Sequence, residues 1–190
     1  MVKYHRNRDN KESIVKVKIS RNKMTELRRL KITDASKIAS LANNKKVWDN
    51  LRDYIPYPYE EKDADYFIGL TEKEDPHQTF GIINSQTELC GVIGLVLQKD
   101  IYRLSAEIGY WLGEQYWGKG ISTKAVELIT TYGFEQLNLE RIFTGVFDFN
   151  KASMRVLEKN GYTREGIFRM AVIKNGVLCD EHRYSKLKSV

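Results

Sequence analysis

The chain has 190 residues, of which 42% are hydrophobic and 29% charged, so it can bury one core and is not disordered throughout. Its net charge of +6 arises in the first 31 residues, which hold eleven Lys and Arg against three Asp and Glu; the other 159 residues carry 20 basic and 22 acidic side chains. This distribution argues against nucleic-acid binding by the body of the chain.

The basic segment is predicted to be an N-terminal arm, partly strand-like, over residues 1–23, and residues 24–190 are predicted to form one domain without repeats or linkers. The two cysteines form no Cys-x-x-Cys pair and the three histidines show no ligand spacing, so neither a metal site nor a disulfide framework is expected. No apolar run approaches about 18 residues, which predicts no membrane segment and a cytoplasmic location.

The first half of the chain alternates between helical and strand-like patterns. Asp34 opens a helix, and the prolines of the segment Tyr54-Ile-Pro-Tyr-Pro-Tyr59 predict a stiff aromatic loop, because proline lacks an amide donor. The other elements expected here are a basic strand-like stretch over residues 14–31, helices over 47–52 and 60–73, and a hairpin of strands 78–83 and 89–97.

The second half begins with a strictly alternating segment over residues 105–112. Ala106, Ile108, Tyr110 and Leu112 share one face, while Glu107, Gly109 and Trp111 share the other. The elements expected after it are a helix over 121–137, a buried strand over 139–147, a helix from the N-cap Asn150 to the stop at Gly161, and a hairpin of strands 162–173 and 177–187 around Asn175-Gly176. This order predicts a mixed sheet with helices on both faces.

A glycine-rich turn over residues 113–120 joins the strand ending at Leu112 to the helix beginning at Ile121. Glycines let the backbone approach a ligand closely, and the unpaired amides at a helix start converge on one place. The helix dipole and Lys119 add positive potential there, so the turn is predicted to bind a pyrophosphate.

Two familiar phosphate motifs do not match this turn. Gly113, Gly118 and Lys119 have the spacing of a nucleotide P-loop, but Gly120 stands where that motif has a Ser or Thr for magnesium. A dinucleotide fingerprint requires a third glycine where this chain has Thr123.

The pattern Gln115-x-x-Gly118-x-Gly120 resembles the acetyl-CoA pyrophosphate loop of the GNAT superfamily of N-acetyltransferases. With residues 107–112 before it and 150–162 after it, the chain looks like the branch that includes the ribosomal-protein N-terminal acetyltransferases, over roughly residues 24–187. The resemblance implies a single GNAT-like α/β (α+β) domain with a mixed, mostly antiparallel sheet of about seven strands. It also implies acetyl transfer from acetyl-CoA to a primary amine in a ternary complex, such as the N-terminal amine of a ribosomal protein.

The resemblance assigns cofactor-binding positions as well. Backbone groups at 110–112 would hold the pantetheine arm, and Asn150 would reach the cofactor from the next helix, although its N-cap role alone also explains it. The implied cofactor-binding residues are Tyr110, Trp111, Leu112, Gln115, Gly118, Lys119, Gly120, Ile121, Ser122, Thr123 and Asn150.

The chemistry requires a base, because an aliphatic amine is mostly protonated at neutral pH. Glu107 is the candidate, with a structural ion pair to Arg103 or Arg141 as the alternative. Many family members use a tyrosine as acid where this chain has Leu157, and Ser153 matches a serine proposed as acid in the ribosomal-protein branch. Its alternative is a plain hydroxyl on a helix face.

The acceptor is left open by the sequence. The resemblance places Trp48, Tyr54, Tyr57 and Tyr59 beside the acceptor groove, and packing of the first helices onto the sheet is the alternative. A protein N-terminus, a polyamine and an antibiotic remain candidate acceptors, a homodimer remains open, and the rival functions are a non-catalytic acyl-CoA-binding module and a nucleotide hydrolase. A covalent route through Cys90 or Cys179 lacks an activating base and is not favoured.

Overall fold

The computed structural model describes residues 25–189, so the predicted arm over residues 1–23 lies outside the described residues. The strands are β1 (Glu26–Arg28), β2 (Thr79–Ile83), β3 (Leu89–Leu97), β4 (Ser105–Leu112), β5 (Arg141–Phe147), β6 (Thr163–Lys174) and β7 (Val177–Leu187). The helices are α1 (Ala35–Ala42), α2 (Lys45–Trp48), α3 (Glu61–Thr71), α4 (Ile121–Glu135) and α5 (Lys151–Lys159), with short 3-10 turns at Ile32–Asp34, Asp100–Tyr102 and Glu114–Tyr116.

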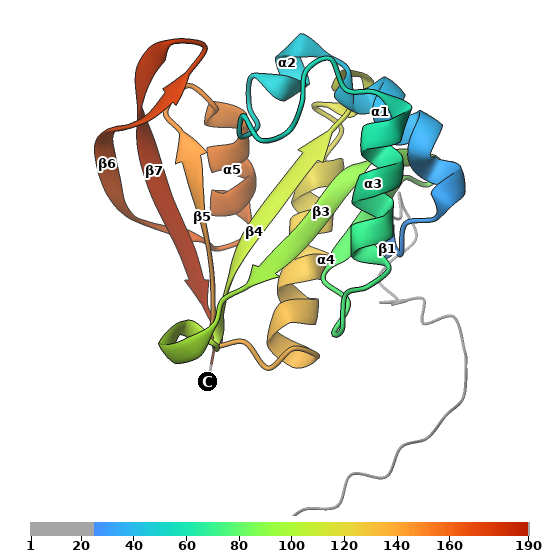
Figure 1. The fold of residues 1–190 in the computed structure, drawn as a ribbon. Helices are drawn as coiled ribbons and strands as arrows, with labels where there is room; N and C mark the ends of the chain where they lie inside the picture. The colour runs from blue at the N-terminus through green and yellow to red at the C-terminus, as the bar shows by residue number, and fades with distance from the viewer. Residues whose placement is uncertain (1–24, 190) are drawn as a thin grey trace, which may run out of the picture.

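All seven strands form one sheet in the order β1-β2-β3-β4-β5-β7-β6. Neighbouring strands are antiparallel except β4 and β5, which are parallel. Helices α1 and α3 cover one face of the sheet and α4 and α5 cover the other (Figure 1). The prediction of a single mixed, mostly antiparallel domain with helices on both faces is confirmed.

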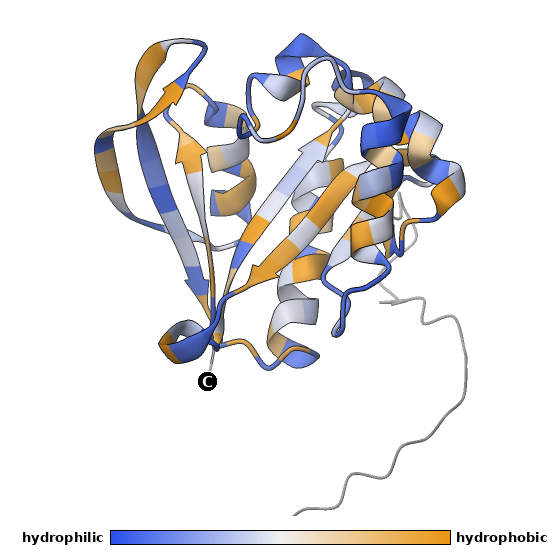
Figure 2. Cartoon of the chain, viewed as in Figure 1, coloured by the Kyte–Doolittle hydropathy of each residue, from blue (hydrophilic) through white to orange (hydrophobic). Residues whose placement is uncertain are grey.

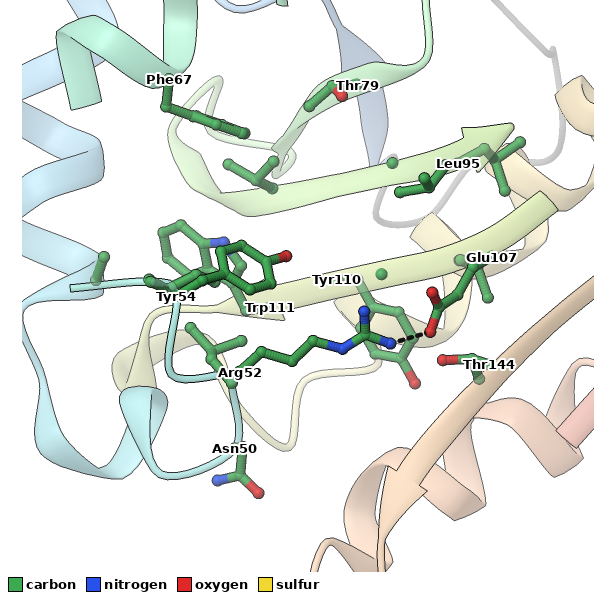
Figure 3. A pocket seen from close by; sticks show the side chains of 18 of the residues that line it. Asn50, Arg52, Tyr54, Phe67, Thr79, Leu95, Glu107, Tyr110, Trp111 and Thr144 are labelled. Atoms are coloured by element: carbon green, nitrogen blue, oxygen red, sulfur yellow. Dashed lines mark hydrogen bonds and ion pairs between the residues drawn. The ribbon is translucent and has the colours of Figure 1, made fainter. Parts of the chain in front are cut away.

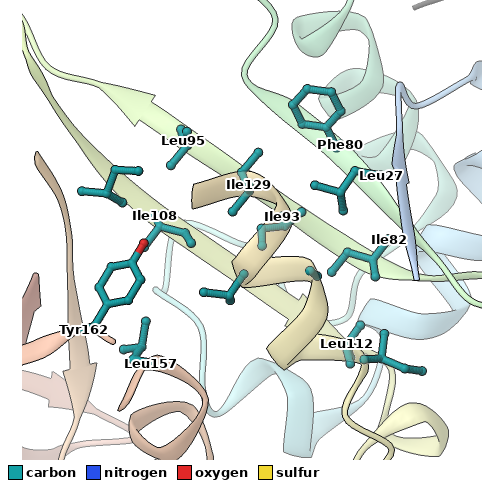
Figure 4. Close-up of a cluster of buried hydrophobic side chains, with 14 of the residues drawn as sticks. Leu27, Phe80, Ile82, Ile93, Leu95, Ile108, Leu112, Ile129, Leu157 and Tyr162 are labelled. Carbon is teal, nitrogen blue, oxygen red and sulfur yellow. The ribbon is translucent and has the colours of Figure 1, made fainter. Parts of the chain in front are cut away.

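Two apolar cores hold these layers together. The larger one lies between the sheet and α4, where Ile93, Ile108 and Ile129 are at most 1% exposed (Figure 4). The smaller one packs Ile38 of α1 and Ile68 of α3 on the opposite face. Apolar residues run along β3, at the centre of the sheet, whereas β7 is mostly hydrophilic (Figure 2).

The parallel pair β4–β5 is joined over only three register positions, from Ser105–Arg141 to Glu107–Phe143. Beyond Glu107 the two strands diverge, which splits the sheet between its β4 half and its β5-β7-β6 half (Figure 1). Because an unpaired strand edge leaves amide and carbonyl groups without partners, this split is the place where an extended ligand can pair with the backbone.

Two predicted elements differ most from the observed ones. Of the strand expected over residues 14–31, residues 14–24 lie outside the described part of the chain, and the strand observed in the rest covers Glu26–Arg28. The helix expected over 47–52 is α2, which begins at Lys45 because the Asn44 side chain caps the Lys46 amide at 2.9 Å. It ends at Trp48. The residues after it do not continue the helix, and Arg52 and Asp53 among them bind Glu107 and Lys174.

Within residues 25–189, no helix is long and apolar enough to cross a membrane. The same residues contain no cluster of three or more His, Cys, Asp or Glu side chains arranged to hold a metal ion.

Candidate functional site

The glycine turn before α4 has the backbone conformation that only glycine adopts readily. Gly118 and Gly120 have φ angles of +73° and +76°, and a Cβ built on either would meet no atom within 4 Å. Gly120 is the N-cap of α4 and supplies no side-chain cap, so the first amides of the helix, at 121–123, lack the usual side-chain acceptor. An anion placed there would satisfy these donors and meet the positive end of the helix dipole.

Neighbouring contacts fix the position of this turn. The Trp117 indole donates to the Leu112 carbonyl oxygen at 2.8 Å, and Tyr116 is buried in the larger core. The ammonium of Lys119 lies 5.8 Å from the Tyr116 ring centroid, at an exposed position beside the two positive-φ glycines. Gln115 is exposed in the 3-10 turn. The turn therefore presents its amides and one cation to the solvent while its aromatic residues anchor it.

Along β4, hydrogen bonds alternate between the two sides of the strand. Gln98 N donates to Ser105 O at 3.0 Å and Gly113 N donates to Cys90 O at 2.9 Å, so the odd-numbered residues of β4 bond to β3. The backbone amide and carbonyl of Tyr110 consequently face the split, where pairing with β5 has already ended. The amide can donate a hydrogen bond to a ligand that lies along β4 like an added strand, and the carbonyl oxygen can accept one from it.

Asn150, Ser153 and Tyr110 form a connected polar group at the start of α5. The Asn150 Oδ1 accepts a hydrogen bond from Ser153 N at 3.0 Å, so Asn150 caps the helix, as the sequence predicted. No acceptor for its Nδ2 is found among the described residues, and Asn150 lines the cavity next to the split. The amide nitrogen therefore remains free to bind a ligand while the oxygen caps α5.

Ser153 has a partner that sequence reasoning missed. Its Oγ lies 2.8 Å from the Tyr110 hydroxyl, which reaches α5 from the core face of β4. Removal of the Tyr110 hydroxyl from solvent raises its pKa, so it remains a proton donor. Leu157, at the position of the usual family tyrosine, is fully buried.

A cavity of about 620 Å³ lies on the α3 face of the sheet and reaches the split. Figure 3 shows Arg52 and Tyr54 on one side of it and Glu107, Tyr110 and Thr144 along the strands. Within the described part of the chain, the charged side chains that line the cavity are Arg52, Asp63, Glu74, Glu107 and Glu181. Carboxylates outnumber cations four to one in this lining, so the lining carries a net negative charge, although Arg183 pairs with Glu181 from outside it.

The alternation of β4 directs Glu107 into this cavity, where its carboxylate is ion-paired with Arg52 (Figure 3). The partners expected from sequence were wrong: Arg141 binds Glu165, and the Arg103 guanidinium donates to the Asp100 carbonyl oxygen. Arg52 lies 55 positions from Glu107, in the irregular segment after α2, and no local pattern signals this pair.

A second carboxylate, that of Glu181, faces the cavity from the far side of the split. Its side chain lies over Gly145 of β5, where an added Cβ would be 2.1 Å from Glu181 Oε1. Arg183 donates to Glu181 Oε2 at 2.8 Å. Glycine at position 145 thus makes the room in which this carboxylate lies, a feature that sequence reasoning missed.

The four predicted acceptor-side aromatic residues lie in different environments. Tyr54 lines the cavity and is 79% exposed, whereas Tyr59 lines it and is packed into the smaller core. Trp48 and Tyr57 pack against each other, with ring centroids 5.5 Å apart, and neither lines the cavity. They form the outer layer of the segment that covers it.

The two cysteines are buried in the strands. Burial raises the pKa of Cys90 to about 11, and Cys179 is 8% exposed. Each thiol lies 3.4 Å from a backbone carbonyl oxygen, and neither lines the cavity. Nothing in this geometry activates a thiol as a nucleophile.

Comparisons with known proteins agree with this geometry. "Probable N-acetyltransferase YjcK" of Bacillus subtilis is 36% identical over 166 residues, which cover 83% of this chain and 90% of that protein. "Putative ribosomal N-acetyltransferase YdaF" of the same species is 40% identical over 100 residues, or 53% of this chain and 54% of that protein. The crystal structure of a spermidine N-acetyltransferase from Vibrio cholerae in complex with CoA and spermine superposes with a TM-score of 0.74 at 25% identity, covering 86% of this chain and 95% of that one.

Residues 25–163 match the family model described as an acetyltransferase (GNAT) domain. The chain therefore belongs to the GNAT acetyltransferase family and is an enzyme that transfers the acetyl group of acetyl-CoA to an amine.

Proposed function

We propose that this enzyme acetylates the primary amine of a small polycationic molecule by direct attack in a ternary complex, with Glu107 as the base. The single observation that carries this proposal is the position of Glu107. Its carboxylate lines an acidic cavity and comes from the residue of β4 at which pairing with β5 ends.

The proposed acetyl-CoA site consists mainly of backbone groups that have no partner within the sheet or helix. The amides of Ile121, Ser122 and Thr123, with Lys119 beside them, would bind the pyrophosphate, and the positive-φ glycines 118 and 120 let it approach. The pantetheine arm would lie along residues 110–112, where the Tyr110 carbonyl oxygen would accept a hydrogen bond from it, and Asn150 Nδ2 would donate to it. Gln115 would border the pyrophosphate from the 3-10 turn.

The acetyl group is transferred when the amine nitrogen bonds to the thioester carbonyl carbon and the carbon–sulfur bond breaks. Glu107 takes the proton that the ammonium must lose, directly or through a water. The bound ammonium replaces Arg52 as the partner of Glu107, and the exposed Arg52 side chain can move to solvent. The Tyr110 amide donates to the carbonyl oxygen as negative charge develops on it.

The departing thiolate requires one proton. Ser153 is the proposed donor, and its hydroxyl regains a proton, through water, from the second N–H that the nitrogen loses after it attacks. The Tyr110 hydroxyl, 2.8 Å away, is the hydrogen-bond partner of Ser153. Because a thiol of ordinary pKa near 8.5 leaves readily, this step contributes less to the rate than positioning the amine does.

The charge of the cavity supports a polycationic acceptor. Four carboxylates and one arginine line it. Glu107 is paired with that arginine and Glu181 with Arg183, and neither Asp63 nor Glu74 has an Arg or Lys partner among the described residues. A molecule with several ammonium groups is attracted by such a potential more strongly than a single N-terminal amine. The solved relative whose structure contains spermine has the same fold.

The N-terminal amine of a ribosomal protein is the second candidate acceptor. The observation in its favour is the 40% identity to the putative ribosomal enzyme YdaF over about half of the chain. Basic N-terminal peptides therefore belong in the same assay as spermidine and spermine.

The test is Glu107→Gln, which keeps the shape of the side chain and removes its basicity. We expect kcat to fall by about 10²- to 10⁴-fold, with the calorimetric Kd for acetyl-CoA unchanged. Glu61→Gln, at an exposed position of α3, is the matched control and should retain wild-type kcat. Unchanged turnover by Glu107→Gln would overturn the proposed base, and the absence of turnover with every amine in the wild-type protein would overturn the proposed acceptor class.

A further inference from the structure

Two glycines lie directly opposite each other in the floor of the cavity. Gly94 of β3 and Gly109 of β4 are register partners, and both line the cavity. A Cβ built on Gly109 would meet no atom within 4 Å, although the residue lies in the centre of a seven-stranded sheet. A Cβ built on Gly94 would lie 3.2 Å from Thr79 Oγ1, so the floor is open over Gly109 and is bordered at Gly94 by the Thr79 hydroxyl.

Side chains rise on both sides of this bare strip. The register pair Val92–Trp111 lies on one side and the pair Val96–Glu107 on the other, and opposite residues of a sheet share a face. The strip is therefore a trough that crosses the strands and begins beside Glu107. We name the space over Gly94 and Gly109 the glycine trough.

Helix α3 forms the roof of the glycine trough. Phe67 and Leu70, one turn apart, line the cavity, whereas Ala64 and Ile68 on the other side of α3 are fully buried in the smaller core. Figure 3 shows Phe67 above the strands and Thr79 at the far side of the cavity from Arg52. Apart from the Glu107 carboxylate, the walls and roof are apolar and suit methylene groups.

A carboxylate closes the far end. Thr79 of β2 is the register partner of Gly94, and its hydroxyl donates to Glu74 Oε1 at 2.6 Å. Glu74 Oε2 accepts from the amides of Gln78 and Thr79 at 2.8 and 2.9 Å, which holds the carboxylate in place. Since adjacent strands are about 4.8 Å apart, Gly109 and Thr79 are separated by about 10 Å.

We propose that the glycine trough binds the tail of the acceptor, and that this tail is an unbranched aliphatic chain with a second cationic group. The reacting nitrogen lies at Glu107, the methylenes cover Gly109 and Gly94, and the distal ammonium binds at Glu74. The proposal rests on the proposed function, since it requires an amine acceptor. It goes further because it fixes the length and the second charge of that acceptor.

The first experiment measures kcat/KM for α,ω-diamines from 1,3-diaminopropane to 1,8-diaminooctane and for monoamines of the same chain lengths. We expect the diamines to improve with length until their nitrogens reach from Glu107 to Glu74, a span of at least about 10 Å, and to exceed the matched monoamines there by about tenfold. Equal values for diamines and monoamines at every length would overturn the trough proposal. Acetylation of an amine with Glu107 as the base would survive that result as long as Glu107→Gln still lowers kcat by about 10²- to 10⁴-fold.

The second experiment uses two variants. Glu74→Gln retains an acceptor for the two amides but removes the charge, so kcat/KM for the long diamines should fall about tenfold while that for monoamines stays within about twofold. Gly109→Ala places a methyl group in the open trough and should raise KM for long diamines more than for 1,3-diaminopropane. Gly69→Ala is its matched control, because a Cβ there also meets nothing within 4 Å and Gly69 does not line the cavity. Equal effects of both variants on long and short amines would contradict the trough.

Discussion

The ammonium of Lys174 lies 3.3 Å from the centroid of the Trp48 ring, with the lysine side chain only 2% exposed. The same ammonium is 2.6 Å from Asp53 Oδ1, and beside it Asn175 Nδ2 donates to Asp49 Oδ1 at 2.8 Å. These contacts tie the β6–β7 turn to α2 and the segment after it. They therefore connect the two halves of the split sheet above the cavity.

Lys174→Met tests this connection. Methionine fills a similar volume but loses the cation–π contact and the ion pair, so we expect the free energy of unfolding to fall by about 1–2 kcal/mol. Because the segment that carries Arg52 would be held less firmly, KM for the acceptor should rise severalfold, while the Kd for acetyl-CoA stays unchanged. Urea denaturation, steady-state kinetics and calorimetry measure the three quantities.

The matched control for this change is Lys62→Met, since Lys62 is exposed and its ion pair with Glu60 is local. It should leave both the acceptor KM and the acetyl-CoA Kd at wild-type values. If Lys174→Met weakened acetyl-CoA binding as strongly as acceptor binding, its role would be general stability rather than positioning. Lys174→Arg, which keeps the charge, should restore part of the acceptor affinity.

Features carried by local patterns were predictable from the sequence. The alternation over residues 105–112 placed Glu107 and Gly109 on the face opposite Ile108, and the structure confirms it. The N-cap at Asn150 and the turn at Asn175-Gly176 follow from side-chain oxygen placement and from backbone conformation, which are also local. The prediction of a sheet of about seven strands, in contrast, depended on the family resemblance.

Features carried by distant pairs were not predictable. Arg52 and Glu107 are 55 positions apart, and Lys174 and Asp53 are 121 apart. Nothing in the spacing of charged residues along a chain selects one long-range partner over another, which is why Arg103 and Arg141 were expected instead. The same contacts explain why α2 ends at Trp48, since Asp49, Arg52 and Asp53 bind residues of other elements.

Gly120→Ala tests the anion site at the start of α4. The φ of +76° is costly for any residue with a Cβ, so the free energy of unfolding should fall by about 1–2 kcal/mol. If the backbone turns to relieve this cost, the amides at 121–123 no longer converge, and the Kd for CoA should rise by about tenfold. Calorimetry with CoA measures the affinity.

Gly161→Ala is the matched control. Gly161 has the same φ of +76° as Gly120, but it follows the C-terminal end of α5 and is not at the start of a helix. It should lower stability by a similar amount and leave the Kd for CoA unchanged. A parallel loss of CoA affinity in both variants would attribute the effect to stability alone and remove the support for the anion site.

Two substitutions at Asn150 separate its two roles. Asn150→Asp keeps an oxygen for the Ser153 amide, so stability should stay within about 0.5 kcal/mol, but it removes the Nδ2 donor and should weaken acetyl-CoA binding. Asn150→Ala removes both and should also lower the free energy of unfolding by about 1 kcal/mol. Wild-type affinity for acetyl-CoA in both variants would leave Asn150 with the helix cap as its sole role.

The pH dependence of stability is predicted from Glu165 on β6. Its pKa is lowered to about 2, chiefly because Arg141 of β5 donates to both carboxylate oxygens and Ser185 of β7 donates to one. A carboxyl group whose folded pKa lies below its unfolded value of about 4.3 stabilises the fold above that value, and loses this contribution as the pH falls toward 2. The pair is partly exposed, so solvent screening limits its contribution to about 1 kcal/mol.

Glu165→Gln removes this contribution. At pH 7 the wild-type protein should exceed the variant in free energy of unfolding by about 1 kcal/mol, and the difference should shrink between pH 4 and pH 2. Urea denaturation of both proteins at pH 7, 4 and 3 measures it. A difference that is the same at pH 3 as at pH 7 would show that Glu165 acts through packing and hydrogen bonds that do not depend on its charge.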